Sequence, residues 1–184
     1  MNKVADKEEK LRVLDENGND TGMIENRSVV HEKELFHDEV ILWIIDKDSK
    51  KVLLERRSPN KKYAPNKLGL CAGHVVANET IEEALAKEAR EELGININNY
   101  DVKKLITIKK IQPNNRCFLH NFYILDKIPL SKFIIQEEEL SEVLYMDYEK
   151  LKELVMSNDK EMAFENAEVY KPIFDLLDNV SREN

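Results

Sequence analysis

The sequence predicts an α/β (α+β) fold in which a β-sheet is covered by helices. Apolar runs rich in β-branched residues, bounded by turn formers, alternate along the chain with segments of helical period. Hydrophobic residues make up 42% of the chain and charged residues 35%, so a sizeable core is available. A length of 184 residues suits one domain. We expect this domain over residues 31–184, with residues 1–30 as an N-terminal extension.

Hydrophobic periodicity and the positions of turn-forming residues predict the secondary-structure elements in chain order. Alternating or apolar runs flanked by Asn, Asp and Gly predict two hairpins and several further strands. The expected strands are residues 11–14 and 23–24, 39–45 and 51–55, 68–72, 102–111, 117–125 and 143–146. Residues 58–66 form a loop by composition. Apolar residues at helical spacing predict helices over residues 80–93, 148–155 and 162–177, the last with a stripe typical of core packing.

Charge and cysteine usage narrow the function. The net charge of −8 disfavours a nucleic-acid polymer as partner, although a small phosphorylated substrate remains compatible with a local basic patch or a bound cation. Cys71 and Cys117 form neither a disulfide framework nor a zinc spacing, which favours a reducing compartment. The charged first ten residues contain no signal-peptide core, and the longest apolar run, residues 40–45, is too short to span a bilayer. We expect a cytoplasmic protein without a membrane partner.

The helix expected at residues 80–93 has an unusual charge distribution. Thr80 and Glu83 form a capping box, and Gly94 is placed to end the helix in a left-handed conformation. At about 100° per residue, Glu88 and Glu92 fall within the apolar stripe and the glutamate at position 91 lies at its edge. An ordinary surface helix keeps its charges on the far side.

These three acids predict a metal site. Positions i, i+3 and i+4 place Glu88, Glu91 and Glu92 next to one another, and no lysine or arginine of this helix is expected on the same side. Clustered anions that face a core repel one another and lose hydration. A hard divalent cation such as Mg²⁺ would resolve the conflict. The alternative, a solvated Glu-rich face, fits the positions of Glu88 and Glu92 poorly.

The segment from Gly73 to Ile95 resembles the Nudix box. That signature has Gly, five residues, Glu, seven residues, then Arg-Glu-hydrophobic-x-Glu-Glu-x-Gly-hydrophobic. Each fixed position matches except one, where Lys87 replaces Arg. The matching residues are Gly73, Glu79, Glu88, Glu91, Glu92 and Gly94.

The resemblance implies an α/β/α sandwich with a mixed sheet and a loop–helix–loop motif that binds Mg²⁺ or Mn²⁺ and cleaves nucleoside diphosphate derivatives. It assigns Glu88 and Glu92 as the principal metal ligands and Glu91 as a further ligand or a base. Gly73, Glu79 and Gly94 would support the motif. Lys87 supplies only a point charge where Arg supplies a planar fork, so we expect catalysis that is retained but slower.

Outside the box, the chain is similar to the branch related to isopentenyl diphosphate isomerase. The shared features are residues 15–22, His31 and His37, residues 56–62 and residues 71–74. In those isomerases, histidines bind metal, a basic loop grips diphosphate and a cysteine directly before the glycine protonates the alkene. Here Ala72 occupies that place and Cys71 lies one residue earlier, which turns it to the other face of a strand. The chain also has the complete glutamate set, so a hydrolase is preferred and Cys71 is expected to be a buried small residue.

Four further residues are candidates for substrate binding. Arg57 and Lys61 lie in the basic loop, where phosphate binding and simple solvation are comparably good interpretations. His74 is expected to face the site, and Glu139 lies in an acidic loop similar to one that supplies another ligand or base in the family. Two alternatives to a hydrolase stay open: an isomerase of isoprenoid diphosphates and a non-catalytic nucleotide-binding module. The sequence does not fix the oligomeric state, and a homodimer is among the assemblies it allows.

Overall fold

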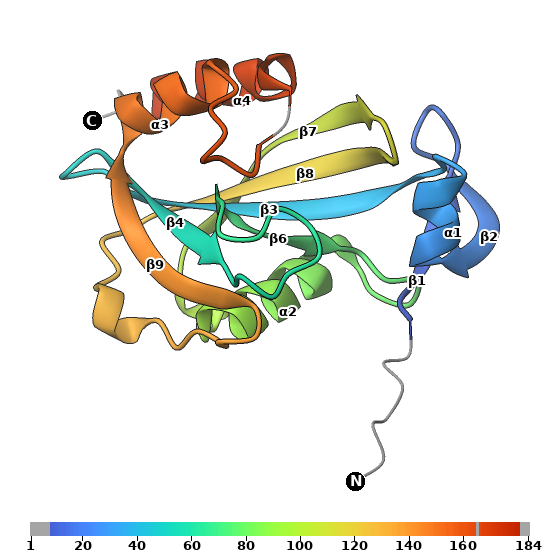
Figure 1. Ribbon diagram of the computed structural model, residues 1–184, viewed down its shortest axis with the longest axis horizontal. Helices are drawn as coiled ribbons and strands as arrows, with labels where there is room; N and C mark the ends of the chain where they lie inside the picture. The colour runs from blue at the N-terminus through green and yellow to red at the C-terminus, as the bar shows by residue number, and fades with distance from the viewer. Residues whose placement is uncertain (1–7, 165, 181–184) are drawn as a thin grey trace, which may run out of the picture.

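The computed structural model describes residues 8–164 and 166–180. Residues 1–7, the start of the expected N-terminal extension, and residues 165 and 181–184 lie outside the described residues. Within the described part, the chain forms nine strands, four α-helices and two short 3₁₀ segments (Figure 1). The strands are β1 (Lys10–Leu14), β2 (Asp20–Asn26), β3 (Phe36–Asp46), β4 (Lys51–Arg57), β5 (Leu68–Gly69), β6 (Cys71–His74), β7 (Val102–Gln112), β8 (Asn115–Leu125) and β9 (Leu140–Asp147). The helices are α1 (Arg27–Glu32), α2 (Ile81–Leu93), α3 (Tyr148–Met156) and α4 (Ala167–Val180), and the 3₁₀ segments are Ile97–Asn99 and Leu130–Lys132.

Strand β3 is the centre of a mixed sheet. One edge of β3 pairs with β8 in parallel, from Phe36 opposite Arg116 to Ile45 opposite Leu125. Its other edge is shared, because β4 pairs with β3 only at two positions and β6 then takes the same edge at residues 39–42. After leaving β3, β4 pairs with β5 and along most of its length with β9. This divergence places the far end of β4 beside β5 and β9 rather than beside β3.

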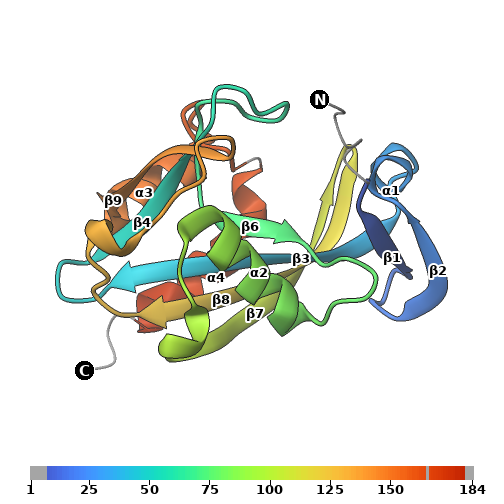
Figure 2. The same ribbon diagram turned by 90° about the horizontal axis from the view of Figure 1, so that it is seen from below.

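Helices cover both faces of the sheet, as Figures 1 and 2 show from two directions. Alternate residues of β3 enter the two cores. Ile41, Trp43 and Ile45 pack with α3 and α4. Val40, Leu42 and Ile44 pack with α2. The layered fold that the sequence predicts is therefore confirmed. Among the described residues, no helix is long and apolar enough to cross a membrane.

Three elements differ from their expected form. The strand expected at residues 68–72 is two short strands, because the chain changes partner from β4 to β3 at Leu70. The last helix begins at Ala167 instead of residue 162, where the Asn158 side chain accepts a hydrogen bond from Ala167 N at 2.9 Å. Met162 and Phe164 are buried as expected but precede the helix. Helix α1 was not expected.

The β1–β2 hairpin contacts the loop between β6 and α2. Ala77 N donates to Lys10 O at 2.8 Å, and Arg12 Nη2 donates to Glu79 O at 3.0 Å. This hairpin therefore supports the loop that leads into α2. The division of the chain at residue 30 stays a prediction.

Candidate functional site

Helix α2 is fixed at both ends by its own sequence. Thr80 Oγ1 accepts from Glu83 N at 3.2 Å, and Glu83 Oε2 accepts from Thr80 N at 2.8 Å, which completes the predicted capping box. Gly94 ends the helix with φ of 67°, a conformation that glycine adopts without strain. A Cβ at Gly94 would also lie 2.6 Å from Ile134 O. The helix therefore holds its side chains at defined positions against the sheet.

Two of the three predicted glutamates are brought together under this helix. Glu92 is buried, with 7% of its surface exposed, and Oε2 accepts a hydrogen bond from Ala72 N at 3.2 Å. Glu88 packs directly on Gly73, where a Cβ would lie 2.1 Å from Glu88 Cδ. Glu91 is exposed. The structure thus pairs Glu88 and Glu92 on the sheet side and leaves Glu91 toward solvent.

Lys87 reaches these acids, contrary to the expectation that no cation of the helix would do so. Its Nζ lies 3.2 Å from Glu79 Oε2 and 3.3 Å from Glu88 Oε1. The expectation is wrong because the lysine side chain is long enough to extend around the helix from its own position. Lys87 therefore joins the loop glutamate Glu79 to the helix glutamate Glu88.

The carboxyl groups remain short of positive charge. Burial raises the pKa of Glu88 to about 7, although the Lys87 ammonium opposes the rise. Burial also raises the pKa of Glu92 well above its usual range, and the neighbouring Glu55 and Glu88 carboxylates add to the effect. Carboxylate oxygens in such a setting suit a hard divalent cation, and Gly73 leaves room for Glu88 beside the strand. The chemistry of Glu88 and Glu92 therefore fits a hard divalent cation.

Strand β4 supplies a glutamate that sequence analysis did not select. Glu55 is 2% exposed, and it shares a strand face with Leu53, which packs in the α2 core. After burial, the nearby Glu55 carboxyl group is the next cause of the raised pKa of Glu92. The signal in the sequence was an acid at an inward-facing position that ends the apolar run of residues 52–54.

The basic loop after β4 lies beside these acids. Lys61 Nζ forms an ion pair with Glu139 Oε2, and Ser58 N donates to Glu139 O at 2.9 Å. Burial raises the pKa of Glu55, and the positive charges of Arg57 and Lys61 oppose the rise. Three predicted substrate-binding residues, Arg57, Lys61 and Glu139, are therefore gathered near the carboxylates.

His74 belongs to a different cluster. On β6, Cys71 and Gly73 face α2, so His74 faces the opposite side of the strand. There His31 Nε2 lies 3.0 Å from His74 Nε2, and one ligand atom from each of His31, His37 and His74 lies within 4.8 Å of the others. Glu39 Oε1 is 3.5 Å from His37 Nε2 and 3.6 Å from His74 Nε2. These imidazoles could hold a transition metal, but His74 is not among the residues that surround Glu88.

Cys71 is buried against α2, as expected for a small core residue. Burial raises the pKa of its thiol, and the nearby Glu92 carboxylate raises it further. The residue is therefore a thiol rather than a thiolate at neutral pH. Ala72, at the position of the isomerase cysteine, is exposed and has no acidic function.

Comparisons with known proteins identify the family of this chain. The family model described as NUDIX domain matches residues 35–171. Nudix hydrolase 3 of Arabidopsis thaliana is 29% identical over 180 residues, which are 92% of this chain and 23% of that protein. The Isopentenyl-diphosphate Delta-isomerase of Mycolicibacterium vanbaalenii is 31% identical over 94 residues, which are 50% of this chain and 51% of the isomerase.

A solved structure from Deinococcus radiodurans has a TM-score of 0.65 at 22% identity, and the match covers 81% of this chain and 90% of that chain. At this level of identity, the likeness supports the fold alone. The NUDIX match spans more than half of the sequence, and it includes β3 to α3 with the complete glutamate motif. The chain therefore belongs to the Nudix hydrolase family.

Proposed function

We propose that this chain is a pyrophosphohydrolase that depends on Mg²⁺ or Mn²⁺ and cleaves a diphosphate linkage in a nucleoside diphosphate derivative or a similar small molecule. The observation that carries the proposal is the pair Glu88 and Glu92, held on the sheet side of α2 without enough positive charge around them. Such an arrangement destabilises a metal-free fold, so its retention at a well-capped helix favours a site that binds a cation.

Each motif residue has a separate task. Glu88 and Glu92 would hold the cation, with Glu91 as a further ligand or a base at the solvent edge. Lys87 positions Glu88 and Glu79 through its two ion pairs. When bound, the divalent ion would neutralise the diphosphate and acidify water for attack on phosphorus.

The basic loop fits the diphosphate group of the substrate. Lys61 and Arg57 stand beside the carboxylates, where their donors can bind phosphate oxygens. Lys61 forms an ion pair with Glu139 in the structure, and an anionic substrate would compete with Glu139 for the Lys61 ammonium group. Release of Glu139 from that ion pair would free its carboxylate to act as a base.

The isomerase remains the second candidate, since the cluster of His31, His37 and His74 is present. Two observations favour hydrolysis instead. Ala72 stands directly before the glycine, where the isomerases have the cysteine that protonates the alkene, and the glutamate set of the Nudix box is complete. A non-catalytic module would be expected to lack part of that set.

The test is a screen of nucleoside diphosphate derivatives with Mg²⁺ or Mn²⁺, in which release of monophosphate is measured. Glu92→Gln should lower turnover by about two orders of magnitude or more, the scale for loss of a charge-stabilising group. Glu82→Gln, an exposed change on the same helix, is the matched control and should keep turnover. Normal turnover in Glu92→Gln would remove Glu92 from the mechanism. Interconversion of isopentenyl and dimethylallyl diphosphate, without hydrolysis of any derivative, would favour the isomerase.

A further inference from the structure

Glu55 lies where an ordinary structural acid would not. It is on β4, 2% exposed, and its Oε2 receives no hydrogen bond from any described residue. An unpaired buried carboxylate oxygen is costly, because the lost hydration is not replaced. Most buried polar atoms in folded proteins avoid this cost by pairing. An unpaired oxygen at this position therefore needs an explanation.

The surroundings of Glu55 are those of the carboxylate site. The anionic groups that act on it are Glu88 and Glu139, and Glu55 in turn is, after burial, the next cause of the raised pKa of Glu92. It faces the same side of the sheet as Leu53 and hence faces α2. The unpaired Glu55 oxygen, the buried Glu92 and the partly buried Glu88 consequently lie in one region between the sheet and α2.

The nearby cations do not satisfy Glu55. Lys61 is engaged by Glu139, and Arg57 Nε donates to Tyr63 O at 3.1 Å. Lys87 is engaged by Glu79 and Glu88. A fixed ammonium or guanidinium partner is thus not provided for the Glu55 oxygen by the described residues.

We propose that Glu55 is an additional ligand of the divalent cation held by Glu88 and Glu92, supplied from strand β4 opposite the helix. This inference rests on the proposed function, because it adds a residue to the same site. A carboxylate from β4 would complement those from α2, so the cation would be chelated by two separate elements. Its binding would join α2 to the β4–β9 part of the sheet.

A purely structural role makes a different prediction. If Glu55 is only a protonated core acid, replacing it with the isosteric amide leaves the affinity for metal unchanged. If it is a ligand, the amide removes a charged donor and weakens binding. Metal affinity therefore separates the two roles, independently of turnover.

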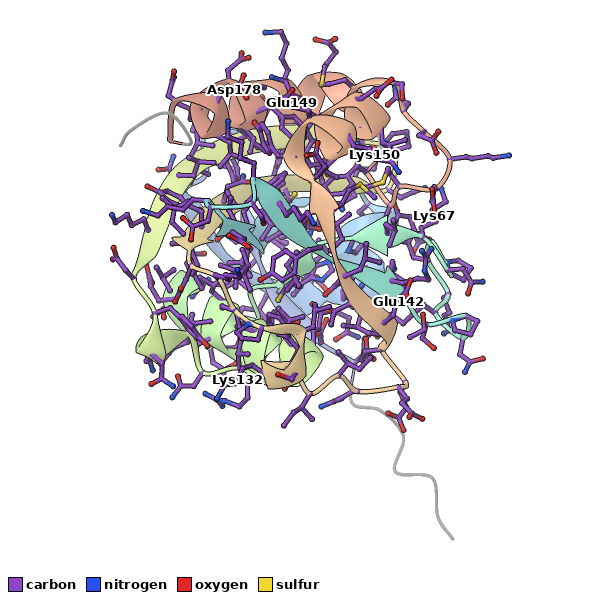
Figure 3. All side chains as sticks on the ribbon, turned by 90° about the vertical axis from the view of Figure 1, so that its left-hand side faces the viewer. Lys67, Lys132, Glu142, Glu149, Lys150 and Asp178 are labelled. Atoms are coloured by element: carbon purple, nitrogen blue, oxygen red, sulfur yellow. The ribbon has the colours of Figure 1, made fainter. Side chains whose placement is uncertain are left out.

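The experiment measures the Kd for Mn²⁺ by electron paramagnetic resonance and the Mg²⁺-induced rise in Tm, with no substrate present. Glu55→Gln should raise the Kd at least tenfold and reduce the rise in Tm, because metal-linked stabilisation follows occupancy of the folded state. The matched control is Glu149→Gln, a change of an exposed acid in the first turn of α3 on the other face of the sheet (Figure 3). The control should keep the wild-type Kd within twofold.

Each further outcome is decisive. An unchanged Kd and Tm rise in Glu55→Gln, together with loss of binding in Glu92→Gln, would overturn this inference and leave the proposed function intact. A wild type that binds neither ion would overturn both. If circular dichroism shows that Glu55→Gln is unfolded, Glu55→Asp decides, since it keeps the charge but withdraws the carboxylate by one methylene. A weaker Kd in Glu55→Asp supports a ligand, and the wild-type Kd refutes it.

Discussion

Gly73 offers a sharp test of how closely catalysis depends on the position of Glu88. Alanine at this position would place Cβ 2.1 Å from Glu88 Cδ and 2.4 Å from Oε1, whereas an ordinary contact begins at 3.4 Å. The carboxyl group would therefore have to move by the difference, about 1.3 Å. Because the Glu88 side chain is only 12% exposed, packs on Gly73 and is bound by Lys87, this displacement carries it away from its place in the site.

The expected result is a loss of turnover with little loss of stability. Misplacing a catalytic group by about 1 Å can cost roughly 10²-fold in rate, so Gly73→Ala should lower kcat by about two orders of magnitude. The backbone itself should accept alanine, because Gly73 is a strand residue and is absent from the positive-φ positions of the chain. The assay compares steady-state hydrolysis in Mg²⁺ with thermal unfolding of the same samples.

Gly69→Ala on the adjacent strand is the matched control. Its Cβ would lie 3.6 Å from Ala163 Cβ, an ordinary contact, and no carboxylate is displaced. We expect near-normal turnover in this variant. Wild-type kcat in Gly73→Ala, or an equal loss in Gly69→Ala, would refute the argument that Gly73 makes room for Glu88.

Three further predictions concern the stability of the protein and the choice between a hydrolase and an isomerase. Without metal, Glu92→Gln should melt at or above the wild-type temperature, because one repelling charge is removed. Mg²⁺ at a hundredfold excess over Kd should stabilise the wild type by roughly 2.7 kcal/mol, and this stabilisation should be smaller in Glu92→Gln. A full Mg²⁺-induced stabilisation of the variant, measured by thermal unfolding, would contradict a main metal site at Glu92. Cys71→Ala should keep hydrolysis largely intact, and an isomerase activity that this change abolishes would reverse the choice of branch. In chelator, Glu88 should favour folding fully below pH 4.5 and lose that contribution as pH rises through about 7, because its folded pKa is raised. The loss should be about 3 kcal/mol at most, and denaturant titrations of wild type and Glu88→Gln isolate it; a difference that does not vary with pH would exclude the raised pKa.

Helix α2 was predictable because its signals are local. A capping box at Thr80 and a left-handed glycine at position 94 fix the ends, and helical periodicity then fixes which side Glu88 and Glu92 face. The structure agrees, because Glu92 is buried and the Glu88 side chain is only 12% exposed. The local sequence was sufficient to predict the ends of α2 and the orientation of its glutamates, since the residues that determine them all lie in or next to the same helix.

The missing parts of the site depend on contacts between distant segments. Glu55 reaches the glutamates because β4 leaves β3 and pairs with β5, the short strand just before β6, and no local pattern encodes this pairing. The pairing of Lys87 with Glu79 depends on how the preceding loop folds back on the helix. His74 was expected near the substrate, but its partners His31 and His37 come from segments around 40 residues earlier. A sequence pattern predicts which face of a helix or strand is buried more readily than it predicts which distant segment packs against that face.

The parallel pairing of β3 with β8 has a consequence for how the chain acquires its structure. Phe36 lies opposite Arg116, so this pairing joins segments that are 80 residues apart. Contacts of such long range must overcome a large loop-closure entropy, which slows folding to the millisecond-to-second range typical of non-local topologies. During synthesis from the N-terminus, one edge of the apolar strand β3 stays unpaired until β8 has emerged from the ribosome. We therefore expect the nascent chain to be most prone to aggregation over residues 40–45 during that interval, before its last strand partner is available.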